Sequence, residues 1–141
     1  MNDTGPVRGV IVAHASLAQA LVRAAQRVAG ADQDSLRWLS NEERGPEALE
    51  RAVRETAGQG PVVLFTDLPS GSCTFAARKV FAGRDDVAVI CGVNLPVLVD
   101  FLFHRDLPLD ELVERLIEKG RAGLTGACKE SERRADSSAA R

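Results

Sequence analysis

Val10-Ile11-Val12-Ala13-His14-Ala15-Ser16 combines the end of an apolar strand, a histidine and the start of a helix within one short stretch. Its β-branched opening is typical of a buried strand, and apolar residues at helical spacing begin directly after Ser16. In an open α/β sheet, ligands bind at this kind of junction, where the carboxyl end of a strand meets the N-terminus of a helix. His14 is one of two histidines in the chain and stands at that junction. It is therefore the first candidate for chemistry.

The rest of the chain repeats this alternation of strand and helix. Strands are predicted at residues 7–13, 35–39, 61–65 and 87–91, the second of them toward a sheet edge. Helical patterns follow from Leu17 to the cap at Gly30, from Pro46 to Gly58, from Cys73 to Gly83, from Asn94 to about His104, and from Pro108 onward. We expect the first helix to bury the face that carries Leu17, Leu21, Ala24 and Val28, with Ala20 and Ala25 beside them.

This order predicts a single doubly wound α/β domain, in which helices flank a mostly parallel four-stranded sheet. The domain should cover residues 1–125. From Gly123 the composition changes, and after Lys129 the chain holds charges, serines and alanines without apolar periodicity. Residues 126–141 are therefore predicted to be a disordered polar tail.

Composition excludes several classes of protein. The chain has 141 residues, 45% of them hydrophobic, and a formal net charge of −2, which gives no reason to expect nucleic acid as a partner. No apolar run approaches a membrane span and no signal peptide opens the sequence, so a cytoplasmic protein is expected. Three widely spaced cysteines predict neither a disulfide framework nor a metal cluster. The glycine motifs of nicotinamide enzymes and P-loop ATPases do not occur.

Two further features can join His14 at the sheet edge. Asp67 follows the third strand, and because the first and third strands can be neighbours in such a sheet, their carboxyl ends can bring Asp67 beside His14. A carboxylate there would fix the tautomer of the imidazole. The turn Ser70-Gly71-Ser72 then opens the next helix, whose free N–H groups favour an anion such as a phosphoryl group. Each feature also has an ordinary interpretation, as a structural histidine, a helix cap and a surface turn.

Three stretches resemble the mannose-family enzyme IIA of the bacterial phosphoenolpyruvate-dependent sugar phosphotransferase system. They are Val12-Ala13-His14-Ala15, the run from Leu64 to Ser72 that contains Thr66-Asp67 and the glycine-serine turn, and Gly92-Val93-Asn94-Leu95-Pro96-Val97-Leu98. The resemblance covers roughly residues 7–124. Where the family commonly has two glycines followed by Ser-Pro in the turn, this chain has Ser70-Gly71-Ser72-Cys73.

The resemblance implies a phosphocarrier. His14 would accept a phosphoryl group from phospho-HPr and pass it to a histidine of an enzyme IIB, with Asp67 orienting the ring. Ser72, Gly71 and Ser70 would hold the phosphoryl oxygens. It also implies a homodimer, no metal or organic cofactor, and contact with the membrane only through IIC and IID subunits.

Other functions use the same residues. His14 could be the phosphorylation site of a regulatory protein without a transport role. It could also belong to the phosphoprotein subunit of dihydroxyacetone kinase, which shares this fold. A third alternative is a non-catalytic module that binds a small anion at the helix N-termini.

Overall fold

The sheet has four strands in the order β2-β1-β3-β4, and each neighbouring pair is parallel. The computed structural model of the chain describes residues 5–139. Its strands are β1 (Arg8–Ala13), β2 (Leu36–Ser40), β3 (Val62–Thr66) and β4 (Val87–Cys91). The predicted parallel four-stranded sheet is confirmed, and so is the place of β2 at an edge.

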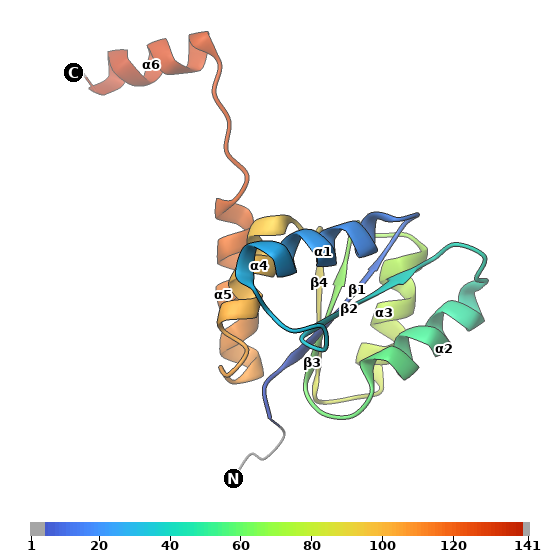
Figure 1. Cartoon of the computed structure of the whole chain (residues 1–141). Coiled ribbons are helices and arrows are strands. Elements are labelled where there is room, and N and C mark those ends of the chain that lie inside the picture. The colour runs from blue at the N-terminus through green and yellow to red at the C-terminus, as the bar shows by residue number, and fades with distance from the viewer. Residues whose placement is uncertain (1–4, 140–141) are drawn as a thin grey trace.

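Helices cover both faces of the sheet (Figure 1). They are α1 (Leu17–Ala29), α2 (Pro46–Ala57), α3 (Ser72–Ala82), α4 (Leu95–Phe103) and α5 (Leu109–Ala122). One hydrophobic cluster joins α1, α4 and α5 to the sheet, and a second joins α2 and α3 to its other face. The fold is therefore the doubly wound α/β domain that the sequence predicts.

Alternating residues of β1 enter the two clusters. Ile11 and Ala13 pack toward α1 and α4, whereas Val10 and Val12 pack toward α2 and α3. All four side chains are fully buried, which explains why this strand reads as a continuous apolar run. The sheet thus holds the end of β1, and with it His14, in a rigid position.

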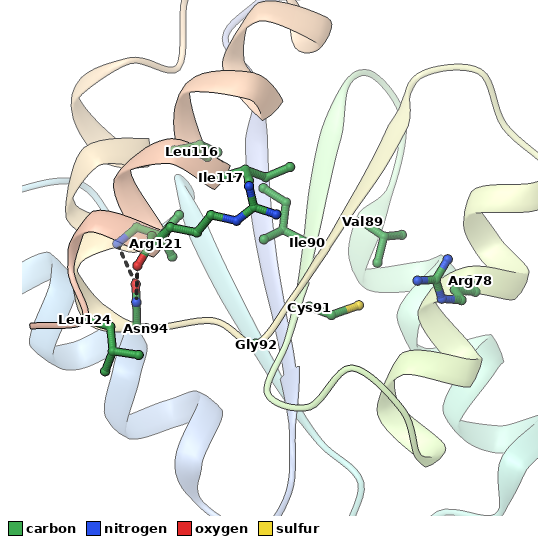
Figure 2. A pocket seen from close by; sticks show the side chains of 12 residues that line it. Arg78, Val89, Ile90, Cys91, Gly92, Asn94, Leu116, Ile117, Arg121 and Leu124 are labelled. Carbon is green, nitrogen blue, oxygen red and sulfur yellow. Dashed lines mark hydrogen bonds between the residues drawn. The ribbon is translucent and has the colours of Figure 1, made fainter.

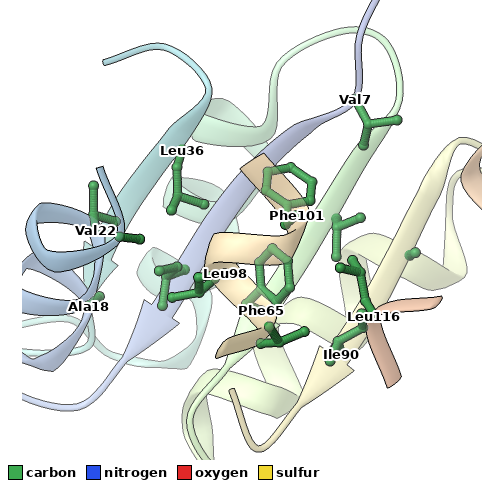
Figure 3. Packing of buried hydrophobic residues seen from close by; sticks show 14 of the residues in the cluster. Val7, Ala18, Val22, Leu36, Phe65, Ile90, Leu98, Phe101 and Leu116 are labelled. Carbon is green, nitrogen blue, oxygen red and sulfur yellow. The ribbon is translucent and has the colours of Figure 1, made fainter. Parts of the chain in front are cut away.

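Aromatic packing anchors α4 on the sheet (Figure 3). The rings of Phe65 and Phe101 meet edge to face with centroids 5.3 Å apart, an arrangement that aromatic quadrupoles favour. Phe101 also lies over Gly9, where a Cβ would come within 2.8 Å of its Cε2 atom and 2.7 Å of Leu36 Cδ1. Glycine at this position lets α4 approach β1 closely.

The face that α1 buries overlaps only in part with the one we predicted, since Ala25 is buried and Leu21 is partly buried. Its buried residues are Ala18, Val22 and Ala25, while Leu17 and Val28 are exposed. Apolar residues lie on both candidate faces, so the helical period alone does not choose between them. The structure selects the face with two alanines, whose small side chains allow close packing.

In the tail, Lys129–Ala139 form a helix, α6. Figure 1 shows it apart from the body of the domain. Good helix formers account for it, and an ion pair between Arg134 and Glu130 (3.2 Å) joins successive turns. Within residues 5–139 no helix combines the length and apolarity needed to cross a membrane.

Candidate functional site

His14 and Asp67 meet at the carboxyl edge of the sheet. Val12 and Thr66 are paired in the register of β1 and β3, so the residues that follow these strands emerge side by side. Nδ1 of His14 lies 2.8 Å from Oδ2 of Asp67, and the backbone N–H of His14 donates to the same oxygen at 2.9 Å. The predicted juxtaposition is confirmed, and the two hydrogen bonds fix the orientation of the ring.

The surroundings of Asp67 keep its carboxylate ionised. Burial by itself would raise its pKa, but hydrogen bonds from the backbone N–H and the ring of His14 outweigh it, and the pKa of Asp67 lies below its ordinary value. An ionised carboxylate only accepts hydrogen bonds, so we assign the ring proton to Nδ1. Nε2 then carries the free lone pair, and it makes no hydrogen bond to any of residues 5–139. The His14 side chain is 42% exposed and that of Asp67 only 10%, so the ring is the accessible member of the pair.

The turn before α3 lies against the His14 ring. Gly71 has φ 106° and ψ −176°, and a Cβ at this residue would lie 4.0 Å from Cε1 of His14. Ser72 begins α3, whose first N–H groups have no partner within the helix. Ser70 and Ser72 are exposed, and neither hydroxyl is hydrogen-bonded to His14. The structure therefore brings Gly71 and the start of α3 to the histidine, with the two serines beside them.

Two buried threonines, which the sequence did not single out, hold this turn. Thr66 at the end of β3 and Thr74 in α3 place their hydroxyl oxygens 2.6 Å apart. The Thr74 hydroxyl donates to the backbone carbonyl of Leu68, and the Thr66 hydroxyl donates to the Thr74 oxygen. The turn from Asp67 to Gly71 is thus tied to the strand before it and to the helix after it.

Cys73 is a second neighbour that the sequence did not indicate. Its side chain is buried, and Sγ lies 3.9 Å from Nδ1 of His14. Burial raises the pKa of the thiol to about 11, and the negative charge of Asp67 acts in the same direction. The thiol is therefore neutral at pH 7. From sequence it resembles any small buried residue on an inward helix face.

The loop after β2 supports the strand end from the other side. The side-chain Oδ1 of Asn41 accepts a hydrogen bond from the backbone N–H of Ala15 at 3.3 Å. The backbone N–H of Asn41 donates to the carbonyl of Ala13 at 3.2 Å. Ala15 has a positive φ of 52°, which is uncommon for a residue with a side chain. Asn41 thus stabilises the turn on which His14 is presented.

Two hollows lie near the carboxyl half of the sheet. One, of about 360 Å³, borders the site through Gly71 and Ser72. The larger, of about 670 Å³, runs along the outer edge of β4 (Figure 2). Apolar side chains of β4 and α5 line it, and arginines stand on its two sides, Arg78 on α3 and Arg121 on α5. In the described part of the chain no strand pairs with this edge of β4.

The depressed pKa of Asp67 predicts a loss of stability in acid. Between its folded pKa and its ordinary value of 3.8, the folded protein binds fewer protons than the unfolded one. The contribution to the free energy of unfolding is therefore complete above the ordinary pKa and disappears as the pH falls through the folded pKa. In urea titrations, the free energy of unfolding of the wild type should fall more steeply below about pH 4 than that of Asp67→Asn. Asp85→Asn, at an exposed carboxylate, should follow the wild type; parallel curves for all three proteins would contradict the prediction.

Comparison with known proteins agrees with this architecture. In solved structures the same fold occurs in the phosphotransferase system component EIIA from Streptococcus agalactiae, with a TM-score of 0.78, 18% identity, and coverage of 85% of this chain and 96% of the other. It also occurs in the mannose/sorbose specific IIA subunit from Enterococcus faecalis, with a TM-score of 0.76, 20% identity, and coverage of 88% and 96%. The fold is thus that of IIA subunits of the phosphotransferase system.

The sequence narrows this class to one family. Residues 9–117 match the family EIIA-man, described as "PTS system fructose IIA component". The mannose-specific EIIAB component of Escherichia coli K12 is 30% identical over 122 residues, which are 82% of this chain and 38% of that relative. The chain belongs to the EIIA-man family, and it spans well under half the length of its curated relatives. His14, Asp67 and Ser72 all lie inside the matched region.

Proposed function

We propose that the chain is a phosphocarrier, a protein-histidine phosphotransferase that receives a phosphoryl group from phospho-HPr on His14 and passes it to an enzyme IIB in sugar uptake. The observation that carries the proposal is the 2.8 Å hydrogen bond between His14 Nδ1 and Asp67 Oδ2. It leaves Nε2, on the accessible ring, as the nucleophile. Membership of a sugar phosphotransferase family supports the same conclusion.

The transfer needs only groups that the site contains. The Nε2 lone pair of His14 attacks the phosphorus of the donor phosphohistidine, and the phosphorus–nitrogen bond of the donor breaks as the new one forms. The ring gains positive charge, which the Asp67 carboxylate stabilises through Nδ1–H. The phosphoryl oxygens face the N-terminus of α3, where Gly71, Ser72 and Ser70 surround them with backbone N–H groups and hydroxyls. The second transfer, to enzyme IIB, runs the same steps in reverse.

The proposal includes the setting of the protein. Phospho-HPr and enzyme IIB are its partners in the cytoplasm, and IIC and IID subunits connect it to the membrane. We propose a homodimer as well, which the open edge of β4 with its apolar groove supports, because unpaired strand edges favour association. Phosphoryl transfer in this scheme requires no metal or organic cofactor.

Intact mass spectrometry tests the proposal. After incubation with enzyme I, HPr and phosphoenolpyruvate, the wild type should gain the mass of one acid-labile phosphoryl group. His14→Ala should gain none, while His104→Ala, which removes the other histidine, should gain it like the wild type. Phosphorylation of His14→Ala would overturn the assignment. An unmodified wild type that binds inorganic phosphate reversibly would instead favour an anion-binding module.

A further inference from the structure

Three potential ligand atoms of different chemistry lie close together at His14. They are Nδ1 of His14, a carboxylate oxygen of Asp67 and Sγ of Cys73, and all lie within 4.8 Å of one another. The end of β1, the end of β3 and the first turn of α3 each supply one of them. An imidazole nitrogen, a carboxylate oxygen and a thiolate sulfur are the three donor types that zinc takes from proteins.

The hydrogen bonding of Asp67 gives an independent indication of a ligand. Its side chain is nine-tenths buried, and within residues 5–139 its Oδ1 atom accepts no hydrogen bond. Because buried carboxylate oxygens are costly to leave unpaired, such an atom calls for an explanation. Coordination of a cation by the Asp67 carboxylate would compensate this cost.

Two of the three separations between these atoms are close to those of a tetrahedral site. Ordinary zinc bond lengths separate nitrogen and oxygen ligands by about 3.4 Å and nitrogen and sulfur ligands by about 3.6 Å. The corresponding distances here are 2.8 Å from Nδ1 to Asp67 Oδ2 and 3.9 Å from Nδ1 to Cys73 Sγ. Shifts of about 0.6 Å in the first distance and about 0.3 Å in the second would produce the tetrahedral separations. The carboxylate oxygen and Sγ lie within 4.8 Å of each other and would have to approach to about 3.6 Å. The fourth position would be left for water, as in zinc sites with three protein ligands.

We propose that His14, Asp67 and Cys73 bind one thiophilic divalent cation of the zinc class, and that this cation inhibits the protein rather than serving as its cofactor. The Cys73 S–H bond breaks as the metal–sulfur bond forms, and its proton leaves to solvent. The cation replaces the proton on Nδ1, which passes through solvent to Nε2. A neutral ring protonated at Nε2 has no lone pair there for a phosphoryl group. The inhibition rests on the proposed function, whereas the binding of the cation does not.

Cobalt(II), which substitutes for zinc and reports thiolate ligands by a charge-transfer absorption, tests the binding without any phosphotransfer. The wild type should bind one cobalt ion per chain with this absorption. Cys73→Ser should lose the absorption and weaken zinc binding by more than the roughly 10- to 100-fold effect of losing an outer-shell partner. Cys91→Ser should keep both. Circular dichroism spectra that match the wild type show that the serine variants are folded.

Because Cys73 is buried, its substitution could weaken metal binding by changing the local structure, so a second variant removes a different ligand. His14→Gln keeps the thiol and removes the imidazole, so it should also weaken zinc binding. His104→Ala is the matched control, because His104 lies 3.4 Å from a carboxylate oxygen of Asp100 but belongs to no cluster of three such ligands among residues 5–139. Absence of cobalt binding by the wild type, or thiolate absorption that persists in Cys73→Ser, would overturn the site.

The effect of zinc on phosphorylation is measured separately. With the enzyme I and HPr relay, zinc should block labelling of the wild type but not of Cys73→Ser, and a chelator should restore it. Labelling that fails even with the chelator would contradict the proposed function and leave the cobalt result standing. Labelling of the zinc-loaded wild type at its normal rate would overturn the inhibitory role.

Discussion

Replacement of Asp67 by asparagine should slow phosphorylation of His14 by about 10²- to 10⁴-fold, the range found when a histidine loses its orienting carboxylate or its proton-transfer role. The carbonyl oxygen of asparagine can take the place of Oδ2 and keep both hydrogen bonds to His14. The negative charge that stabilises the ring is lost, however, and the amide NH₂ is left in the buried place of Oδ1, which accepts no hydrogen bond from residues 5–139. If the asparagine amide is flipped, its NH₂ group faces the backbone N–H of His14. Two donors then meet and no hydrogen bond forms.

Rapid-quench kinetics with phospho-HPr would measure this effect. Asp100→Asn provides the matched control, because Asp100 pairs with the other histidine, His104, away from the site. This control should lose some stability, since Asp100 also binds Arg115, but its phosphorylation rate should stay at the wild-type value. A rate for Asp67→Asn close to the wild type would contradict the role of the carboxylate.

The central pair of the site was predictable from sequence for a geometric reason. Neighbouring parallel strands end at the same edge of a sheet, so a histidine after β1 and an aspartate after β3 are brought together once the strand order is known. The apolar runs of β1 and β3 are buried on both faces and bounded by polar residues, which makes their ends easy to locate.

Other parts of the site depend on tertiary packing that no local pattern encodes. Cys73 comes within 3.9 Å of His14 Nδ1 because α3 turns its inward face toward the end of β1, a direction that the sequence around Cys73 does not specify. Tertiary packing also determines which face of α1 is buried. Apolar residues lie on two sides of this helix, and the close packing distance favours the side with Ala18 and Ala25. Asn41 reaches the site only through the pairing of β2 with β1.

Substitution of Gly71 by alanine should affect both stability and phosphoryl transfer. Its φ of 106° is a conformation that residues with a Cβ rarely adopt, so we expect a loss of about 1–3 kcal/mol in the free energy of unfolding. To relieve this strain the turn must move, and the N–H groups at the start of α3 move with it. Since a displacement of about 1 Å near reacting atoms costs on the order of 10²-fold in rate, phosphorylation of His14 should slow by that order.

Gly30→Ala separates the two effects. Gly30 also has a positive φ, 70°, but it caps the far end of α1 and a Cβ there would meet no atom within 4 Å. Both variants should unfold at lower urea concentration than the wild type, whereas only Gly71→Ala should accept the phosphoryl group slowly. Equal rates in the two variants would mean that the turn between Asp67 and α3 does not hold the phosphoryl group. A slow Gly71→Ala beside a fast Gly30→Ala would attribute the loss to the position of this turn against His14, because strain elsewhere in the fold is then without effect on transfer.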